Sequence, residues 1–136
     1  MSERIEKSVI LAAGLGLRLN DVMQGYPKGF LVFGEKPIIE ESIDKLMEFG
    51  IREILIVTGY AASCYEALKE KYDCIRTIKC ELFATSGSLY SLYMARDFIH
   101  EDFLLLESDL IYEKRALQEV ISFPQEDCIL LSGPTN

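Results

Sequence analysis

The stretch that decides the fold is Val9-Ile10-Leu11-Ala12-Ala13-Gly14-Leu15-Gly16-Leu17-Arg18-Leu19. Its first three residues form a continuous apolar run, which predicts a short buried strand. Two alanines and two glycines follow, and they give a loop whose main chain another group can approach closely. Arg18 adds a permanent, forked cation just beyond this loop. A strand that leads into a glycine loop and a cation favours phosphate binding, because successive N–H groups converge on an anion.

The glycine loop alone does not identify the ligand, because a strand that ends in a flexible turn gives the same pattern. The dinucleotide fingerprint Gly-x-Gly-x-x-Gly fails, since Leu19 stands at its third glycine, and no Gly-Lys-Ser/Thr follows as a P-loop requires. A second cation stands in a nearby segment whose proline fixes the backbone, Pro27-Lys28-Gly29-Phe30-Leu31. We predict that Arg18 and Lys28 bind phosphate groups.

The composition is that of one ordinary globular domain. The chain has 136 residues, of which 49% are hydrophobic and 26% are charged, so it has enough apolar material for a core. Its net charge of −8 argues against nonspecific nucleic-acid binding, which requires a basic surface. A small anionic ligand is compatible with this charge, since a few local cations and a metal ion are enough to hold it.

The sequence gives no sign of membrane insertion or of a metal-binding cysteine motif. No segment approaches the roughly 18 apolar residues of a membrane span, and the charged residues 1–7 lack the apolar stretch of a signal peptide. We therefore expect a cytoplasmic protein without a membrane partner. The cysteines form no Cys-x-x-Cys pair, which favours reduced, mostly buried thiols over a metal site; they are Cys64, Cys74, Cys80 and Cys128.

Strand and helix patterns alternate along the chain. Apolar runs predict five strands, at residues 9–11, 54–57, 74–78, 103–106 and 128–131, and a short extended piece at residues 30–33. Helical patterns run from Pro37 to a terminating Gly50, over residues 62–71, from residue 88 onward, and over residues 113–122. This alternation, without repeats or a linker, predicts an α/β domain with a mostly parallel sheet and helices on both faces.

Two groups of polar residues follow predicted strands. Thr85, Ser86 and Ser88 surround Gly87 at the start of a helix. One hydroxyl could be the helix cap, but three are more than capping requires. Asp109 follows the fourth predicted strand, where a carboxylate either lies at a ligand crevice or forms an exposed acidic turn. A buried carboxylate needs a cation, and Mg²⁺ suits a phosphate site.

Five segments together resemble the nucleotidyltransferases with a glycosyltransferase-A-like fold. They are residues 11–19, 27–31, 56–60, 88–92 and 106–110, in the order in which that family has them. The resemblance implies a Rossmann-like nucleotide-diphospho-sugar transferase fold, and an enzyme that joins a nucleotide to a phosphate or phosphonate and releases pyrophosphate. The last three segments are most similar to cytidylyltransferases for phosphocholine and 2-aminoethylphosphonate, and residues 105–113 are most similar to the aminoethylphosphonate enzyme.

Position by position, the resemblance implies a role for each candidate residue. The implied nucleotide-binding residues are Ala12, Ala13, Gly14, Gly16, Arg18, Lys28, Gly87 and Ser88. Arg18 would clamp the triphosphate of CTP, and Lys28 would stabilise charge at the α-phosphorus, so these two would be the catalytic residues. Ser88 would lie against the cytosine, and Asp109 would hold Mg²⁺, the implied cofactor. The acceptor oxygen would attack in line, with positioning and charge neutralisation as the source of catalysis.

Two features depart from the family pattern. Glu107-Ser108-Asp109 stands where many relatives have Asp-x-Asp, and the chain is much shorter than such domains. We interpret residues 1–136 as the N-terminal nucleotide-binding part of a C-terminally truncated nucleotidyltransferase domain, or as one half of a fused protein. Whether this part alone turns over substrate stays open. We expect it to expose apolar surface and to self-associate.

Other functions stay open at this point. The enzyme could act on phosphocholine or on a sugar 1-phosphate with another base. The chain could also be a nucleotide-binding module without turnover, or an inactive fragment. A flavodoxin-like binding domain with an incidental glycine loop is a further alternative, against which the segment around Lys28 argues.

Overall fold

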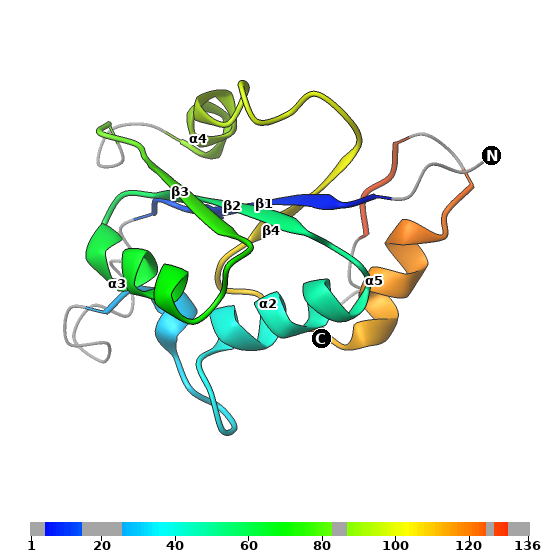
Figure 1. Ribbon diagram of the computed structural model, residues 1–136, viewed down its shortest axis with the longest axis horizontal. Helices are drawn as coiled ribbons and strands as arrows, with labels where there is room; N and C mark the ends of the chain where they lie inside the picture. Colours follow the sequence, from blue (N-terminus) through cyan, green and yellow to red (C-terminus); the bar gives the residue numbers. More distant parts are fainter. Residues whose placement is uncertain (1–4, 15–25, 83–86, 125–126, 131–136) are drawn as a thin grey trace, which may run out of the picture.

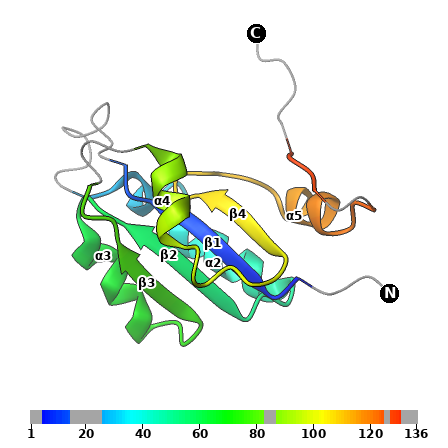
Figure 2. The same cartoon turned by 90° about the horizontal axis from the view of Figure 1, so that it is seen from above.

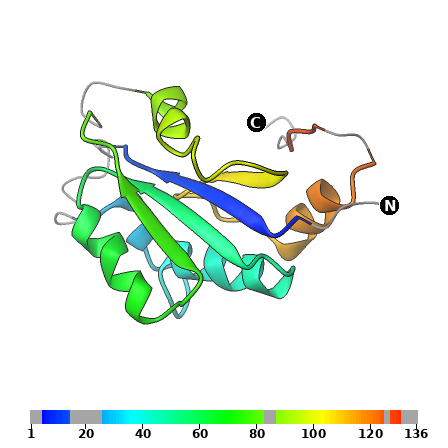
Figure 3. The same cartoon turned by 45° about the horizontal axis from the view of Figure 1, so that its top comes forward.

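Four parallel strands form one sheet at the centre of the molecule (Figures 1 and 3). The structure is a computed structural model that describes residues 5–14, 26–82, 87–124 and 127–130. The strands are β1 (Lys7–Ala12), β2 (Glu53–Thr58), β3 (Ile75–Lys79) and β4 (Phe103–Glu107). Their order across the sheet is β3-β2-β1-β4, and every neighbouring pair is parallel. The predicted α/β fold with a parallel sheet is confirmed.

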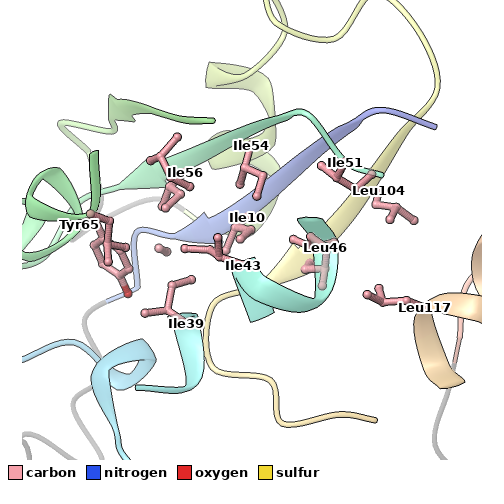
Figure 4. Close-up of a cluster of buried hydrophobic side chains, with 14 residues drawn as sticks. Ile10, Ile39, Ile43, Leu46, Ile51, Ile54, Ile56, Tyr65, Leu104 and Leu117 are labelled. Carbon is pink, nitrogen blue, oxygen red and sulfur yellow. The ribbon is translucent and has the colours of Figure 1, made fainter. Parts of the chain in front are cut away.

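Helices cover the two faces of the sheet unequally. In Figure 1, one face carries α2 (Ile38–Glu48), α3 (Ala62–Glu66), the 3-10 turn η3 (Ala67–Glu70) and α5 (Lys114–Ile121), and the other carries α4 (Ser88–Met94). The buried side chains on the first face form the α2 cluster, which includes Ile10, Ile39, Ile43, Leu46, Ile54, Ile56, Tyr65 and Leu117 (Figure 4). Those on the second face form the α4 cluster, which consists of Val9, Leu11, Ala13, Leu55, Val57, Cys80 and Ala95. None of the described helices is long and apolar enough to cross a bilayer.

β1 is buried on both faces, as its continuous apolar run predicts. Val9 and Leu11 belong to the α4 cluster, whereas Ile10 and Ala12 belong to the α2 cluster. This division follows from strand geometry, in which successive side chains point to opposite faces. A strand with both faces covered needs apolar residues at every position, and that requirement explains the uninterrupted run.

α2 follows the predicted amphipathic pattern. Ile39, Ile43 and Leu46 are fully buried against the sheet, at helical spacing along one face of the helix. Pro37 is the residue that precedes the helix rather than its first helical residue. Gly50 ends the helix with a φ of 91°, the left-handed conformation that favours glycine at this position. The predicted boundaries of this helix are therefore correct to within one residue.

The piece predicted to be extended at residues 30–33 is confirmed in part, whereas the strand predicted at residues 128–131 is not found. Phe30 ends η2 (Lys28–Phe30), a 3-10 turn closed by a 2.9 Å hydrogen bond from the Phe30 amide to the Pro27 carbonyl. Leu31 is extended, and Val32 forms an isolated antiparallel bridge with Pro37. The described residues 127–130 form no strand, and Ile129 is 85% exposed. An apolar run becomes a strand only where it pairs with the free edge of a neighbour, and these residues do not pair with β4. Leu131, the last residue of that run, lies outside the described residues.

The cysteines are more exposed than predicted. All four are free thiols, but only Cys80 is fully buried, and Cys128 is exposed. Cys80 belongs to the α4 cluster, whereas Cys74 immediately precedes β3, at the margin of the sheet. The expectation of mostly buried thiols is therefore wrong, because the other three lie outside the interior of the two clusters.

The order of the strands reverses at β1. The chain passes from β1 through α2 to β2 on one side, and it reaches β4, on the other side of β1, from β3 through α4 (Figure 2). The helices that follow β1 and β4, α2 and α5, cover one face of the sheet, whereas α4, which leads into β4, covers the other. Such a switch point leaves a crevice beyond the carboxyl ends of the strands, where ligands bind in open α/β sheets.

We expect Ile43→Ala to lower the free energy of unfolding by about 2–5 kcal/mol, because it leaves a cavity in the α2 cluster. Met47→Ala, on the same helix, is the matched control, since Met47 is 47% exposed and its truncation should cost under about 1 kcal/mol. Urea denaturation of both variants measures the difference. Equal losses would contradict the orientation of α2 on the sheet.

Candidate functional site

Two small hollows open at the carboxyl end of β1. The Lys28 hollow has a volume of about 90 Å³ and is lined by Leu11, Ala12, Gly14, Pro27, Lys28, Tyr65, Glu107, Ser108 and Asp109. The Ser88 hollow has a volume of about 160 Å³ and is lined by Leu11, Ala13, Gly14, Gly87, Ser88, Ser91 and Glu107. Because Leu11, Gly14 and Glu107 belong to both, the two hollows are adjacent and form one candidate site at the switch point.

Lys28 is held by the turn in which it lies. Pro27 precedes it with extended backbone, and the η2 turn then directs the chain past the end of α3. Phe30, at the end of η2, packs edge-on against Tyr65 with 5.2 Å between the ring centroids. This aromatic contact fixes η2 on the α2 cluster and leaves Lys28 beside the hollow.

Gly29 allows this turn to approach its neighbours closely. A Cβ atom at this position would lie 3.0 Å from the Tyr65 hydroxyl oxygen and 3.2 Å from the Ser108 carbonyl oxygen. Both distances are shorter than ordinary van der Waals contacts, so a side chain here would push the turn outward. The Lys28 turn and the turn after β4 are therefore packed directly against each other.

Two carboxylates stand beside the Lys28 hollow. Glu107 ends β4, and Asp109 follows two residues later. The Ser108 amide donates a 3.0 Å hydrogen bond to the Leu11 carbonyl, which ties this turn to β1. Partial burial raises the pKa of Glu107 above its usual value, and the nearby Asp109 carboxylate adds to the shift. The two charges therefore repel each other, and a cation between them would relieve the repulsion.

This donor set fits the way in which proteins hold Mg²⁺ at phosphate sites. Mg²⁺ is usually bound by one or two carboxylates together with the phosphates of a substrate, and not by a cage of protein ligands. Within the described ranges, no His, Cys, Asp and Glu side chains gather in groups of three or more that could hold a metal ion. Asp109 and Glu107 supply the oxygen ligands that such a shared site needs.

The Ser88 hollow is formed by the start of α4. Gly87 precedes the helix as its cap residue, and Ser88 is the first helical residue, with no side chain capping the helix. Of the hydroxyl residues that could have been the cap residue, Ser88 is therefore excluded, and its side chain is exposed. Ser91, one helical turn later, is buried and lines the same hollow.

Gly14 and Gly87 leave the site open. A Cβ atom at either position would meet no atom within 4 Å, and neither glycine has a positive φ. Unlike Gly29, these two glycines are thus not required by the packing or the backbone conformation of the protein. Their lack of a side chain keeps the hollows accessible to another molecule.

The structure brings most of the predicted site residues together. Ala12, Lys28 and Asp109 line the Lys28 hollow, Ala13, Gly87 and Ser88 line the Ser88 hollow, and Gly14 lines both. Gly16, Arg18, Thr85 and Ser86 lie outside the described residues. That these residues bind a ligand stays a prediction.

Sequence reasoning assigned no ligand role to three further lining residues, Tyr65, Ser91 and Glu107. Tyr65 lies within the helical pattern of residues 62–71, where helical spacing marks it only as an inward-facing residue. The one signal in the sequence was its hydroxyl, since a buried tyrosine usually needs a hydrogen-bond partner.

Residues 7–129, nearly the whole chain, match the family described as nucleotidyl transferase. The chain belongs to the nucleotidyl transferase family. The resemblance found in the sequence motifs is confirmed, and with it the relation to nucleotidyltransferases of Rossmann-like fold.

Relatives of this nucleotidyl transferase include cytidylyltransferases. Choline-phosphate cytidylyltransferase of Streptococcus pneumoniae is 32% identical over 127 residues, which cover 90% of this chain and 55% of that protein. CMP-5'-(3-aminopropyl)phosphonate synthase of Streptomyces rubellomurinus is 28% identical over 136 residues, which cover 94% of this chain and 21% of that protein. Among solved structures, CTP:phosphocholine cytidylyltransferase from Streptococcus pneumoniae has a TM-score of 0.71 and 34% identity over 79% of this chain and 46% of that one. This nucleotidyl transferase chain thus spans about half the length of the choline-phosphate relative.

We expect Glu107→Gln to raise the melting temperature at neutral pH, because it removes the cost of partly burying the Glu107 charge and, in addition, its repulsion from Asp109. The pKa of Glu107 is raised in the folded state, so the wild type loses stability as the pH rises through that value. The increase in melting temperature should therefore become smaller as the pH falls and vanish below pH 4.5, the ordinary pKa of a glutamate side chain.

Thermal melts across this pH range measure the effect. Glu119→Gln is the control, since Glu119 lies on the exposed side of α5, outside both hollows. A gain that persists at low pH would show that the charge of Glu107 is not its cause.

Proposed function

We propose that the protein containing this chain is a Mg²⁺-dependent cytidylyltransferase. It transfers CMP from CTP to a small phosphonate or phosphate and releases pyrophosphate. The observation that carries this proposal is the convergence of Lys28, two carboxylates and two open glycine positions on adjacent hollows at the switch point. The cytidylyltransferases among the relatives favour CTP as the nucleotide.

The size of the hollows suggests how a nucleotide is divided between them. Each is smaller than the roughly 300–1,000 Å³ pockets that enclose whole ligands of this class. A nucleotide would therefore extend over the end of β1 and use both. We assign the cytosine to the Ser88 hollow, where Ser88 and Ser91 offer hydroxyls, and the phosphates to the Lys28 hollow, where the charged groups lie.

The charged residues then have separate tasks in the reaction. The Lys28 ammonium binds oxygens at the α-phosphorus and neutralises charge that develops there during transfer. Arg18, which lies outside the described residues, clamps the triphosphate by its guanidinium fork. Asp109, with Glu107 beside it, holds Mg²⁺ at the phosphates. When bound, this ion supplies charge neutralisation and orientation of the triphosphate.

Little acid–base catalysis is needed in this reaction. The attacking oxygen of a phosphonate or phosphate acceptor is already anionic, so no residue has to remove a proton from it. Catalysis comes from in-line positioning and from neutralising negative charge. This agrees with a site whose charged lining residues are Lys28, Glu107 and Asp109, and which has no histidine among its described lining residues.

We propose 2-aminoethylphosphonate as the acceptor, on the basis of residues 105–113. The aminopropylphosphonate synthase among the relatives supports a phosphonate. Phosphocholine is the second candidate, because the choline-phosphate enzyme is 32% identical. Both acceptors combine an anionic group with an amine or ammonium, and the tests below separate them. Sugar 1-phosphates and binding without turnover are outcomes of the same tests.

Lys28→Ala is expected to weaken CTP binding about tenfold or more, because a charge-assisted hydrogen bond is lost. Lys69→Ala is the matched control, since Lys69 is exposed on η3, pairs with Glu66 at 2.7 Å and lies outside both hollows. Calorimetric titration with CTP in the presence of Mg²⁺ measures both affinities. Equal affinity of the two variants would remove Lys28 from the nucleotide site.

The reaction itself is tested by phosphorus NMR with CTP, Mg²⁺ and each acceptor. We expect CMP-aminoethylphosphonate and pyrophosphate, with a preference for 2-aminoethylphosphonate over phosphocholine. Asp109→Asn should lower turnover by on the order of 10²–10³ without lowering the melting temperature, because it removes an electrostatic stabiliser at the phosphates.

A preference for phosphocholine would overturn the choice of acceptor alone. CTP binding without product from any acceptor would favour a nucleotide-binding module. Normal turnover of Asp109→Asn at limiting Mg²⁺ would exclude Asp109 as the metal ligand.

A further inference from the structure

Tyr65 is the largest fully buried side chain among the described residues, and its hydroxyl has no partner. The ring belongs to the α2 cluster, and the hydroxyl points out of that cluster, toward η2 (Figure 4). The hydroxyl oxygen is buried and makes no hydrogen bond to any described residue. A buried donor without a partner costs free energy, so this hydroxyl needs an explanation, and a partner in a ligand-bound state is one.

The hydroxyl lies at the junction of the two turns that carry the charged site residues. Gly29, next to Lys28, is close enough that an added Cβ would be 3.0 Å from this oxygen. The same added Cβ would lie 3.2 Å from the carbonyl oxygen of Ser108, the residue next to Asp109. Tyr65 also lines the Lys28 hollow. Gly29 thus lies against both the Tyr65 hydroxyl and the turn that carries Asp109.

The hydroxyl is a donor at any physiological pH. Burial raises the pKa of Tyr65 to about 12, and the charge of Asp109 adds to the shift. The polar groups of Ser108 and Gly29 act in the opposite direction, as donors that face the phenol oxygen do, and so they supply no acceptor for its proton. A small movement of either turn would supply the acceptor that is missing.

We propose that Tyr65 is a positioning residue of the nucleotide site, whose hydroxyl donates to the Ser108 turn when a bound phosphate draws the Lys28 and Asp109 turns together. The inference rests on the proposed function, since it needs a phosphate held by both turns. In this arrangement the Tyr65 ring limits how closely the Lys28 and Asp109 turns can approach each other. The hydrogen bond then holds the two turns at the distance that they have when the ligand is bound. The hydrogen bond therefore contributes to ligand affinity and not to the stability of the free protein.

Tyr65→Phe tests this, because it keeps the ring and removes only the hydroxyl. We expect the melting temperature of the free protein to stay within about 2 °C or to rise, since no hydrogen bond is lost. The affinity for CTP with Mg²⁺, measured by calorimetry, should fall about three- to tenfold.

Tyr72→Phe is the matched control and should give the opposite pattern. Its hydroxyl shares its one proton between two acceptors, Glu40 Oε1 at 3.3 Å and Asp44 Oδ1 at 3.2 Å, and Tyr72 lies outside both hollows. This variant should lower the melting temperature of the free protein and leave CTP affinity unchanged.

Gly29→Ala supplies a second measurement. Its Cβ would press on the Tyr65 hydroxyl and the Ser108 carbonyl, separate the turns and weaken CTP binding. In the Tyr65→Phe background one of these obstacles is absent, so the additional loss should be smaller than in the wild type.

The outcomes separate the inference from the function on which it rests. Equal CTP affinity of wild type and Tyr65→Phe, or strictly additive losses with Gly29→Ala, would overturn the role of Tyr65 alone. A marked fall in the melting temperature of free Tyr65→Phe would assign the hydroxyl to structure and overturn it as well. A wild type that binds no CTP would overturn the proposed function and this inference together.

Discussion

β1 forms hydrogen-bonded ladders on both of its edges, and the rest of the structure depends on this double pairing. Its residues pair in register with β2 on one side and β4 on the other, so that Leu11 stands opposite both Val57 and Glu107. Because all three strands are parallel, their carboxyl ends meet at one edge of the sheet. The buried Ser8 hydroxyl adds a 3.2 Å hydrogen bond to the Leu104 carbonyl. The candidate site lies at this edge because the pairing of β1 with β2 and β4 fixes where the loops after these strands begin.

The sequence was sufficient to predict secondary structure where the local hydrophobic pattern agrees with the burial of the segment in the fold. Uninterrupted apolar runs predicted β1, β2 and β4, and a less apolar segment predicted β3, because each of these strands needs an apolar surface on one or both faces. The run of β4 also located Asp109 just after a strand end. The pattern failed for residues 128–131, since an apolar run without a pairing edge does not become a strand. It also could not find the role of Tyr65, because the position of a hydroxyl relative to two distant turns depends on tertiary packing alone.

Under the proposed function, the charge around the site suits an anion that brings its own cation. The chain is strongly acidic, and two carboxylates stand beside Lys28 at the Lys28 hollow. A free triphosphate would be repelled by these carboxylates, whereas one that carries Mg²⁺ would be attracted. Under the proposed function, the repulsion between Glu107 and Asp109 disfavours metal-free nucleotide. The acidic composition and the phosphate ligand are thus compatible.

The two hollows rest on apolar clusters on opposite faces of the sheet. The Lys28 hollow is backed by the α2 cluster through Tyr65, and the Ser88 hollow adjoins the α4 cluster through Ala13. Leu11, Gly14 and Glu107 line both hollows, whereas the remaining lining residues of the two differ. Under the proposed function, substitutions confined to those remaining residues would change the recognition of the base without changing the handling of the phosphates, or the reverse. The base preference of such a site could then diverge while its phosphate chemistry is kept.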